Sequence, residues 1–210
     1  ILYFHGNSHN VSFHLSQVAW LVDEGFDVVM VDYRGYGASD GELSLAKTVS
    51  DMAMIMGWFN AQYEDQPRWL LGQSLGASLA IHVAGSNETF RHSFSGVIFD
   101  SGFASFQSIG QDVLARFWLT WPLQYPLSWL MPKGYDAKTA IASLAPTPVM
   151  ILHSEHDTVV PYRHGQDLYK AAVEPKYFVH YQGRHIQGFS QSHVREHVLV
   201  FLHTKNHGSQ

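Results

Sequence analysis

The apolar residues of this chain fall into six short runs separated by longer stretches of mixed character. The runs cover residues 2–5, 27–32, 69–72, 96–100, 149–153 and 177–181, and they are rich in Val, Ile, Leu and Phe. They lack the alternation of apolar and polar positions that marks a half-exposed strand, which is the pattern of strands covered on both faces. We therefore predict six buried strands.

The stretches between these runs carry apolar residues at helical spacing. They lie at residues 11–24, 44–62, 75–85, 162–172 and 189–203. Strands that alternate with helices favour an α/β fold with a mainly parallel sheet and helices on both of its faces. Because no internal repeat, low-complexity tract or linker interrupts residues 1–210, we expect a single domain.

One segment breaks this rhythm. Residues 103–145 separate two predicted strands by far more than an ordinary crossover, and they contain three of the six tryptophans, Trp118, Trp121 and Trp129. Long insertions at the carboxyl ends of strands are where lids and substrate pockets occur, so we expect a short cap. We expect the three tryptophans to bind substrate by lining an acyl pocket; the alternative is that they only pack the cap.

The length of the apolar part of this insertion, residues 113–131, also raises the possibility of a transmembrane helix. Pro122 and Pro126 interrupt it, and a membrane span at this place would divide the predicted sheet in two. We therefore interpret the segment as a cap.

Composition narrows the classes of function. The chain is 46% apolar and 15% charged with a formal net charge of -5, and it has no basic stripe, so we expect no nucleic-acid partner. It has no cysteine, which excludes disulfides and a thiol nucleophile. His193 and His197 are four residues apart on a predicted helix, but no further ligand completes a metal site, and we interpret them as surface residues.

The chain opens at Ile1 inside a predicted strand, without an initiator methionine or a signal peptide. We expect the native protein to continue upstream. If that upstream segment contains an anchor, the protein is membrane-associated; otherwise we expect it to be cytoplasmic. The sequence therefore leaves membrane association open. The sequence leaves the oligomeric state open as well.

A candidate nucleophile stands between a predicted strand and a predicted helix. Ser74 is the centre of a Gly-Gln-Ser-Leu-Gly motif at residues 72–76, and a serine on such a sharp turn is held clear of the backbone. A second Gly-x-Ser-x-Gly motif surrounds Ser39, but it lies in a polar loop several residues after a strand. We therefore predict Ser74 as the nucleophile and Ser39 as a loop residue.

A serine nucleophile needs a base and an acid that orients the base, both at the carboxyl ends of the strands. His185 follows the last predicted strand on a short glycine-containing loop, whereas other histidines lie within strands or helices. Asp157 follows the preceding strand and gives the order Ser74, Asp157, His185, which is the order expected where a Gly-x-Ser-x-Gly turn between a strand and a helix carries the nucleophile. Asp100 is the rival acid, as a strand-end residue that could instead organise the cap, and Glu155 is a lesser one.

Two backbone N–H groups are needed to stabilise an oxyanion. Leu75 supplies one at the start of the helix after Ser74, where the helix dipole also favours negative charge. The loop after the first strand should supply the other, and because Gly6 lets the backbone approach the substrate we assign it to Asn7. The alternative is that residues 5–7 form only a turn.

Five ordered motifs together resemble the alpha/beta-hydrolases over essentially the whole chain. They are His-Gly-Asn at 5–7, Asp-Tyr-Arg-Gly-Tyr-Gly-Ala-Ser-Asp-Gly at 32–41, Gly-Gln-Ser-Leu-Gly-Ala at 72–77, His-Ser-Glu-His-Asp-Thr-Val-Val-Pro at 153–161 and Gly-Arg-His at 183–185. The chain is most similar to the esterase-like and serine-aminopeptidase-like branch that includes YfhR-type proteins and abhydrolase-domain depalmitoylase-like proteins. The resemblance implies a triad of Ser74, Asp157 and His185 and an oxyanion hole formed by Asn7 and Leu75.

The sequence departs from that family in three ways. The first two strands of the full fold are missing, which leaves six in the order 4-3-5-6-7-8 in the family's labels and exposes the strand at 27–32 as an edge. Ser154 stands where the branch usually has glycine. The cap is short, so the family's substrate preferences do not carry over.

These observations predict a serine hydrolase that cleaves a small-molecule carboxylic ester or thioester through an acyl-enzyme and needs no cofactor or metal. One alternative is an aminopeptidase or amidase. Another is a non-catalytic binding protein on the same scaffold, since this fold hosts many functions.

Overall fold

The strands of the computed structural model, which describes residues 1–203, form one six-stranded sheet. All neighbouring strands are parallel, and their order is β2-β1-β3-β4-β5-β6. This is the α/β class and the strand order predicted above. The strands are β1 (Leu2–Phe4), β2 (Val29–Met30), β3 (Trp69–Gln73), β4 (Gly96–Asp100), β5 (Val149–Ser154) and β6 (Lys176–Tyr181).

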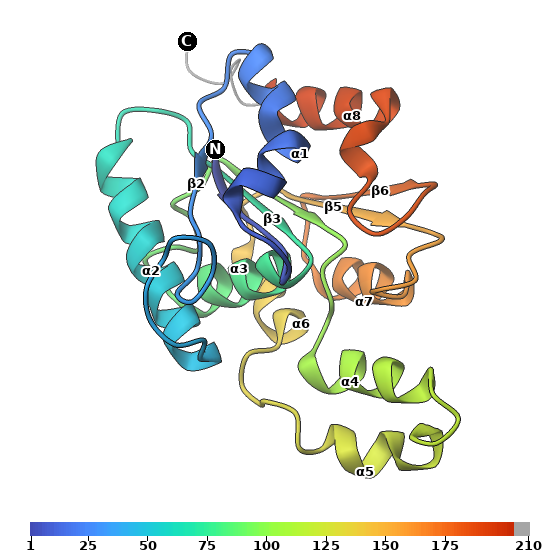
Figure 1. The fold of residues 1–210 in the computed structure, drawn as a ribbon. Helices are drawn as coiled ribbons and strands as arrows, with labels where there is room; N and C mark the ends of the chain where they lie inside the picture. Colours follow the sequence, from blue (N-terminus) through green and yellow to red (C-terminus); the bar gives the residue numbers. More distant parts are fainter. Residues whose placement is uncertain (204–210) are drawn as a thin grey trace.

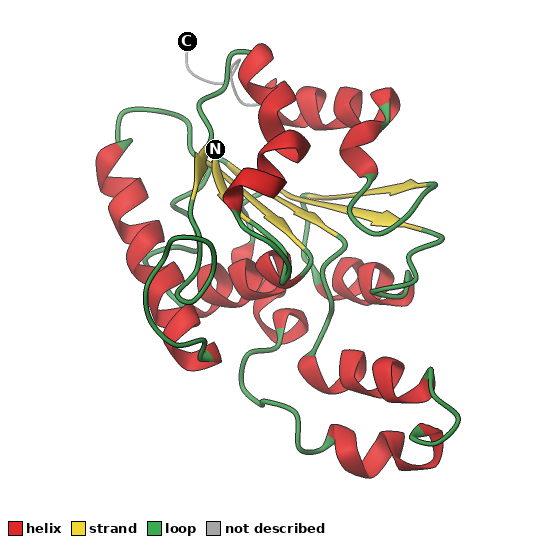
Figure 2. Cartoon of the chain, viewed as in Figure 1, coloured by secondary structure: helices red, strands yellow, loops and turns green. Residues whose placement is uncertain are grey.

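Helices cover both faces of the sheet (Figures 1 and 2). On one face lie α1 (Val11–Asp23) and α8 (Ser192–His203), which follows the short 3-10 helix η3 (Gly188–Ser190). On the other lie α2 (Leu45–Gln62), α3 (Leu75–Ser86) and α7 (Arg163–Ala171). All five predicted helices are present, and their ends differ from the predicted ones by at most three residues.

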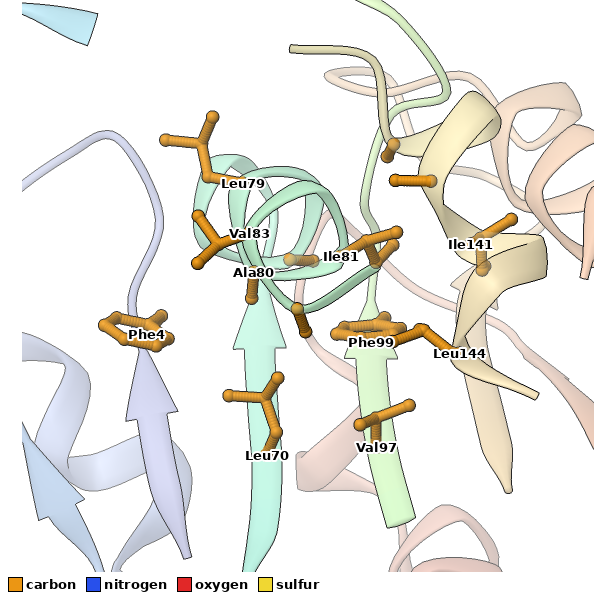
Figure 3. Packing of buried hydrophobic residues seen from close by; sticks show 14 of the residues in the cluster. Phe4, Leu70, Leu79, Ala80, Ile81, Val83, Val97, Phe99, Ile141 and Leu144 are labelled. Carbon is orange, nitrogen blue, oxygen red and sulfur yellow. The ribbon is translucent and has the colours of Figure 1, made fainter. Parts of the chain in front are cut away.

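The period of the strands divides the core into two layers. On β3, Leu70 joins the cluster of buried side chains beneath α2 and α3, whereas Trp69 and Leu71 join the cluster beneath α1 and α8. Successive side chains of a strand point to opposite faces of the sheet. An apolar run therefore places apolar side chains on both faces, and helices must cover both faces to bury them. Figure 3 shows Phe4, Leu70, Val97 and Phe99 of the first layer against the side chains of α3.

The edge strand β2 is shorter than predicted. Residues 27–32 were expected as a strand, but only Val29 and Met30 pair with β1, and the chain then turns away. The Asp32 carboxylate instead accepts a hydrogen bond of 2.8 Å from the backbone N–H of Val11, at the start of α1. A two-residue edge strand presents few unpaired backbone groups to other chains.

The insertion after β4 folds as short helices. These are α4 (Phe106–Ala115), the 3-10 helix η1 (Trp121–Leu123), α5 (Gln124–Ser128), α6 (Ala137–Ala140) and the 3-10 helix η2 (Ile141–Leu144). In Figure 1, α4 and α5 project from the carboxyl end of the sheet, while α6 returns to the body. Among residues 1–203, no helix has both the length and the apolar character needed to cross a membrane.

Phe99 provides a test of the first layer, because its side chain is fully buried. Phe99→Ala leaves a cavity that neighbouring rings and helices cannot fill, and it should lower the free energy of unfolding by about 3–5 kcal/mol. Urea denaturation measures this change. Phe13→Ala, at an exposed position of α1, is the control and should change stability by about 0.5 kcal/mol or less; equal losses in both variants would contradict this packing.

Candidate active site

Ser74 occupies the turn between β3 and α3 in a conformation that side chains rarely adopt. Its φ is 54° and its ψ is -119°. Its backbone N–H donates a 2.8 Å hydrogen bond to the carbonyl oxygen of Asp100 at the end of β4. Backbone strain of this kind costs about 1–3 kcal/mol and persists only where surrounding contacts enforce it. The turn leaves the Ser74 side chain half-buried at the carboxyl edge of the sheet.

The glycines on either side of Ser74 are required by close backbone approaches. A Cβ atom at Gly76 would lie 2.3 Å from the carbonyl oxygen of Phe4, and one at Gly72 would lie 2.6 Å from the Cα of Ala77. Both contacts are with backbone atoms, which cannot move aside as a side chain can. The motif therefore allows α3 to start directly against the ends of β1 and β3.

The structure brings Ser74, His185 and Asp157 into one chain of hydrogen bonds. His185 Nε2 lies 2.8 Å from Ser74 Oγ, and His185 Nδ1 lies 2.6 Å from Asp157 Oδ2. Since a carboxylate only accepts hydrogen bonds, Nδ1 carries the proton and Nε2 is left to accept from the serine hydroxyl. The three residues come from loops after β3, β5 and β6, as their sequence positions predicted.

The surroundings of Asp157 favour its ionised form. Its other oxygen, Oδ1, accepts 2.8 Å hydrogen bonds from the backbone N–H groups of Val159 and Val160. Burial acts to raise the pKa of Asp157, but the hydrogen bond and charge of His185, with these two N–H groups, leave it below its usual value. The buried His153 lies beside this carboxylate, with its Nε2 3.8 Å from Asp157 Oδ2 and 2.9 Å from the Val160 carbonyl oxygen.

Asp100, the rival acid, belongs to a buried network beneath the site rather than to the cap. It accepts a 2.9 Å hydrogen bond from Gln73 Nε2 and a 2.8 Å hydrogen bond from the Tyr181 hydroxyl. Tyr3 in turn donates to Gln73 Oε1 at 2.6 Å, which fixes the orientation of that amide. Burial raises the pKa of Asp100, and the hydrogen bonds from Gln73 and Tyr181 oppose this rise. Asp100 therefore fastens β3 and β4 to β6; the expectation that it organises the cap is wrong.

The loop after β1 approaches Ser74 as predicted. A Cβ atom at Gly6 would lie 3.4 Å from the Cβ of Ser74. Tyr36 donates to both Asn7 oxygens, at 3.1 Å to the carbonyl and 2.6 Å to Oδ1, and Tyr33 donates to the His5 carbonyl oxygen at 2.7 Å. Both tyrosines lie in the motif at 32–41, but nothing in the sequence pattern indicates that their hydroxyl groups support this loop.

Leu75 is the first residue of α3, so its backbone N–H belongs to the first turn, whose N–H groups have no partner within the helix. Together with the loop at Asn7, it borders the same cavity as Ser74. The two groups predicted to bind an oxyanion thus flank the serine.

A cavity of about 510 Å³ opens beside Ser74 between the body and α4. Leu79, Phe103, Phe106 and Ile109 are among its apolar walls, and Arg116 is the one charged side chain among the described residues that line it. Its volume lies within the range of small-molecule binding sites. The arrangement can hold an apolar group next to the serine hydroxyl.

The cap tryptophans lie elsewhere. Trp118, Trp121 and Trp129 are not among the residues that line this cavity, and all three are exposed. The expectation that they form its wall is therefore wrong in this structure. Their part of the chain turns away from Ser74 after Arg116, and α4 faces the cavity with residues that precede it, Phe106, Ile109 and Val113.

Ser39, the serine of the second motif, donates a 2.9 Å hydrogen bond to the Asp32 carbonyl oxygen within the loop between β2 and α2. His193 and His197 both lie on α8, where His197 Nδ1 bonds to the carbonyl oxygen of His193. Within residues 1–203, no group of three or more His, Cys, Asp and Glu side chains is placed to hold a metal ion.

Comparison with known families identifies the kind of protein that this site belongs to. A family model described as serine aminopeptidase, S33, matches residues 1–144, which include Ser74 and its flanking glycines. The chain belongs to this family of alpha/beta-hydrolases. It is therefore a member of a hydrolase family, and the observed sheet agrees with that assignment.

Individual relatives agree with the family. The chain is 32% identical to the YfhR protein of Escherichia coli (strain K12), over 96% of this chain and 69% of that protein. It is also 27% identical to the lysophosphatidylserine lipase ABHD12 of Danio rerio, over 84% of this chain and 48% of the lipase.

Solved structures of esterases and lipases share the fold. The Pyrococcus furiosus esterase Pf2001 superposes with a TM-score of 0.72 at 19% identity, covering 97% of this chain and 79% of the esterase. A monoacylglycerol lipase from Paleococcus ferrophilus superposes with a TM-score of 0.66 at 17% identity, covering 96% of this chain and 91% of the lipase. At these identities the similarity establishes the fold alone.

Proposed function

We propose that this hydrolase cleaves carboxylic esters or thioesters through an acyl-enzyme on Ser74. The observation that carries the proposal is the hydrogen-bonded series Ser74, His185, Asp157 at the mouth of an apolar cavity. Such a series activates a serine because the histidine can take its proton as the new bond forms.

In the first half of the reaction, Ser74 Oγ bonds to the substrate carbonyl carbon while its proton moves to His185 Nε2. The carbonyl electron pair moves onto oxygen, and the backbone N–H groups of Asn7 and Leu75 stabilise the resulting oxyanion. The oxyanion then collapses, the C–O or C–S bond to the leaving group breaks, and His185 gives its proton to that group. Asp157 orients the imidazole and stabilises its positive charge.

In the second half, water attacks the acyl carbon and gives a proton to His185 Nε2. A second oxyanion forms in the same place and collapses with cleavage of the bond to Ser74 Oγ, which recovers the proton from His185. The products are the free acid and the original hydroxyl, so these steps require no cofactor and no metal.

The lining of the cavity favours an ester with an apolar acyl group over a peptide with a free amino terminus. An aminopeptidase needs a carboxylate to bind the substrate ammonium group, and no Asp or Glu is among the described residues that line the cavity. A purely binding role is less well supported, because the hydrogen-bond geometry around Ser74 is that of an activated nucleophile.

The first test concerns the nucleophile. Ser74→Ala removes the attacking oxygen and should abolish both ester turnover and labelling by a fluorophosphonate probe, while circular dichroism shows an intact fold. Ser39→Ala is the matched control and should retain both activities. Loss of activity in Ser39→Ala with retention in Ser74→Ala would mean that the other motif carries the nucleophile.

The second test separates the two buried aspartates. Asp157→Asn and His185→Ala should each lower kcat by about 10³-fold or more, because the three groups act as one unit. Asp100→Asn should lower kcat far less, since Asp100 bonds to Gln73 and Tyr181 and not to His185. Steady-state kinetics with a p-nitrophenyl ester measures all three; similar losses for Asp100→Asn, with Asp157→Asn near wild type, would assign the acid to β4.

The third test concerns the acyl pocket. Ile109→Trp fills part of the cavity and should lower kcat/KM for long-chain p-nitrophenyl esters by about tenfold, the equivalent of roughly two buried methylene groups, while the acetate ester is little affected. Trp121→Ala, outside the cavity, should leave the chain-length profile unchanged. A uniform loss over all chain lengths in Ile109→Trp, or a shifted profile in Trp121→Ala, would contradict this pocket.

A further inference from the structure

The cap exposes more large apolar side chains than any other part of the described chain. Nine of the nineteen exposed large hydrophobic residues within residues 1–203 lie between positions 113 and 130, with exposed fractions from 45% to 86%. They are Val113, Phe117, Trp118, Leu119, Trp121, Leu123, Tyr125, Trp129 and Leu130. An exposed apolar cluster of this kind usually marks an interaction surface. We call residues 113–133 the cap tip.

The packing of the cap does not account for this exposure. Helix α5 is joined to α4 through smaller or polar groups: Gln111 Nε2 donates to Ser128 Oγ at 3.3 Å, and a Cβ atom at Gly110 would lie 2.8 Å from Met131 Cγ. These contacts close the pair of helices and leave the aromatic residues outside. In Figure 1 the pair projects from the carboxyl end of the sheet, and although α4 contacts α7 through Asp112, the nine large apolar side chains remain exposed.

The charge of the cap tip has one sign. Arg116 and Lys133 are its only charged residues in a chain of net charge -5. The nearest carboxylates on either side are engaged with the protein: Asp112 pairs with Arg163 and His164 of α7, and Asp136 Oδ1 accepts a hydrogen bond from the Phe106 N–H. The surface that remains combines tryptophan, tyrosine and leucine with positive charge, the composition of protein segments that lie in a membrane interface.

We propose that the cap tip docks on the surface of a lipid bilayer that carries anionic headgroups. Tryptophan and tyrosine place an apolar ring among the acyl chains and a polar group among the headgroups, and Arg116 and Lys133 face the anionic lipid. The docked segment lies in the interface and does not span the bilayer.

A second copy of this chain fits the surface less well. Symmetric dimers bring the same patch of both copies together, so the positive charges of two cap tips would meet with no carboxylate between residues 113 and 135 to pair with them. An anionic bilayer offers complementary charge and also accepts a projecting shape.

The cap tip is continuous with the mouth of the cavity. Val113 and Arg116 belong to both, and Arg116 Nη2 donates to the Val159 carbonyl oxygen, which places the start of the cap tip against the loop that holds Asp157. Leu43 and Val159 extend the exposed apolar rim on the body side. Docking would therefore direct the cavity mouth toward the bilayer; that this delivers an acyl ester to Ser74 rests on the function proposed above, whereas the docking itself does not.

The experiment measures co-flotation with vesicles of phosphatidylcholine and phosphatidylglycerol in a 3:1 ratio, and with vesicles of phosphatidylcholine alone. The wild type should bind the anionic vesicles, and should bind neutral vesicles or high-salt samples several-fold less. The triple variant Phe117→Ser, Leu119→Ser, Leu130→Ser should lose at least tenfold in partition coefficient. The matched control is Trp58→Ser with Val200→Ser, whose wild-type side chains are 52% and 66% exposed on α2 and α8, and it should bind like the wild type.

Two further measurements make the result decisive. Both variants should hydrolyse a soluble short-chain p-nitrophenyl ester like the wild type, which shows that they fold and keeps a failure of the proposed function separate from a failure of docking. Sedimentation velocity without vesicles should give the same species for all proteins. The proposal is overturned if the wild type does not float, if the control loses as much binding as the cap-tip variant, or if the wild type is a dimer that the cap-tip variant converts to monomer.

Discussion

The conformation of Ser74 is the constraint on which the rest of the site depends. A residue with φ of 54° between a strand and a helix has a strained backbone. The free energy of this strain is offset by contacts that β1, β3 and β4 make with the turn. Gly76 lets α3 touch the end of β1, Gly72 lets it fold back over β3, and the Asp100 carbonyl holds the Ser74 N–H. The parallel sheet places these contacts at one edge, because the carboxyl ends of all its strands lie there.

Next to this turn, the buried ends of the strands are held together by hydrogen bonds between polar side chains and not by apolar contacts alone. Hydrogen bonds from Tyr3 to Gln73, from Gln73 to Asp100 and from Tyr181 to Asp100 run across the sheet from β1 to β6. A buried hydrogen bond is directional, whereas apolar contacts can slide, so this network sets the relative positions of the strand ends. Ser101, which also has a φ of 54°, extends it toward the His185 loop, since the Ile186 N–H lies 3.5 Å from Ser101 Oγ. The network thus joins the support of the Ser74 turn to that of the loop that carries His185.

The motif around Ser74 and the rule that parallel strands end at one edge of the sheet were sufficient to predict which residues come together, but not which side chains support them. Ser74 follows from the sequence because its turn is local, and His185 and Asp157 follow because a parallel sheet restricts where partners can lie. The link from Tyr36 to Asn7 and that from Tyr181 to Asp100 join residues 29 and 81 positions apart, and no pattern in the chain indicates which hydroxyl meets which oxygen. Strand β2 was predicted too long because an apolar run shows that residues are covered, but not that they pair with a neighbouring strand.

The tryptophans of the cap show a different limit of sequence reasoning. Apolar cap residues were expected to be buried against a substrate beside Ser74, because burial of apolar area is the usual driving force for placing such residues. Burial, however, requires that a segment can fold back, and the aromatic residues between Phe117 and Trp129 remain exposed on the short helices of the cap. The same driving force then acts between molecules instead of within one. The sequence indicates how much apolar surface must be covered, whereas only the path of the chain shows whether the protein covers it or a partner does.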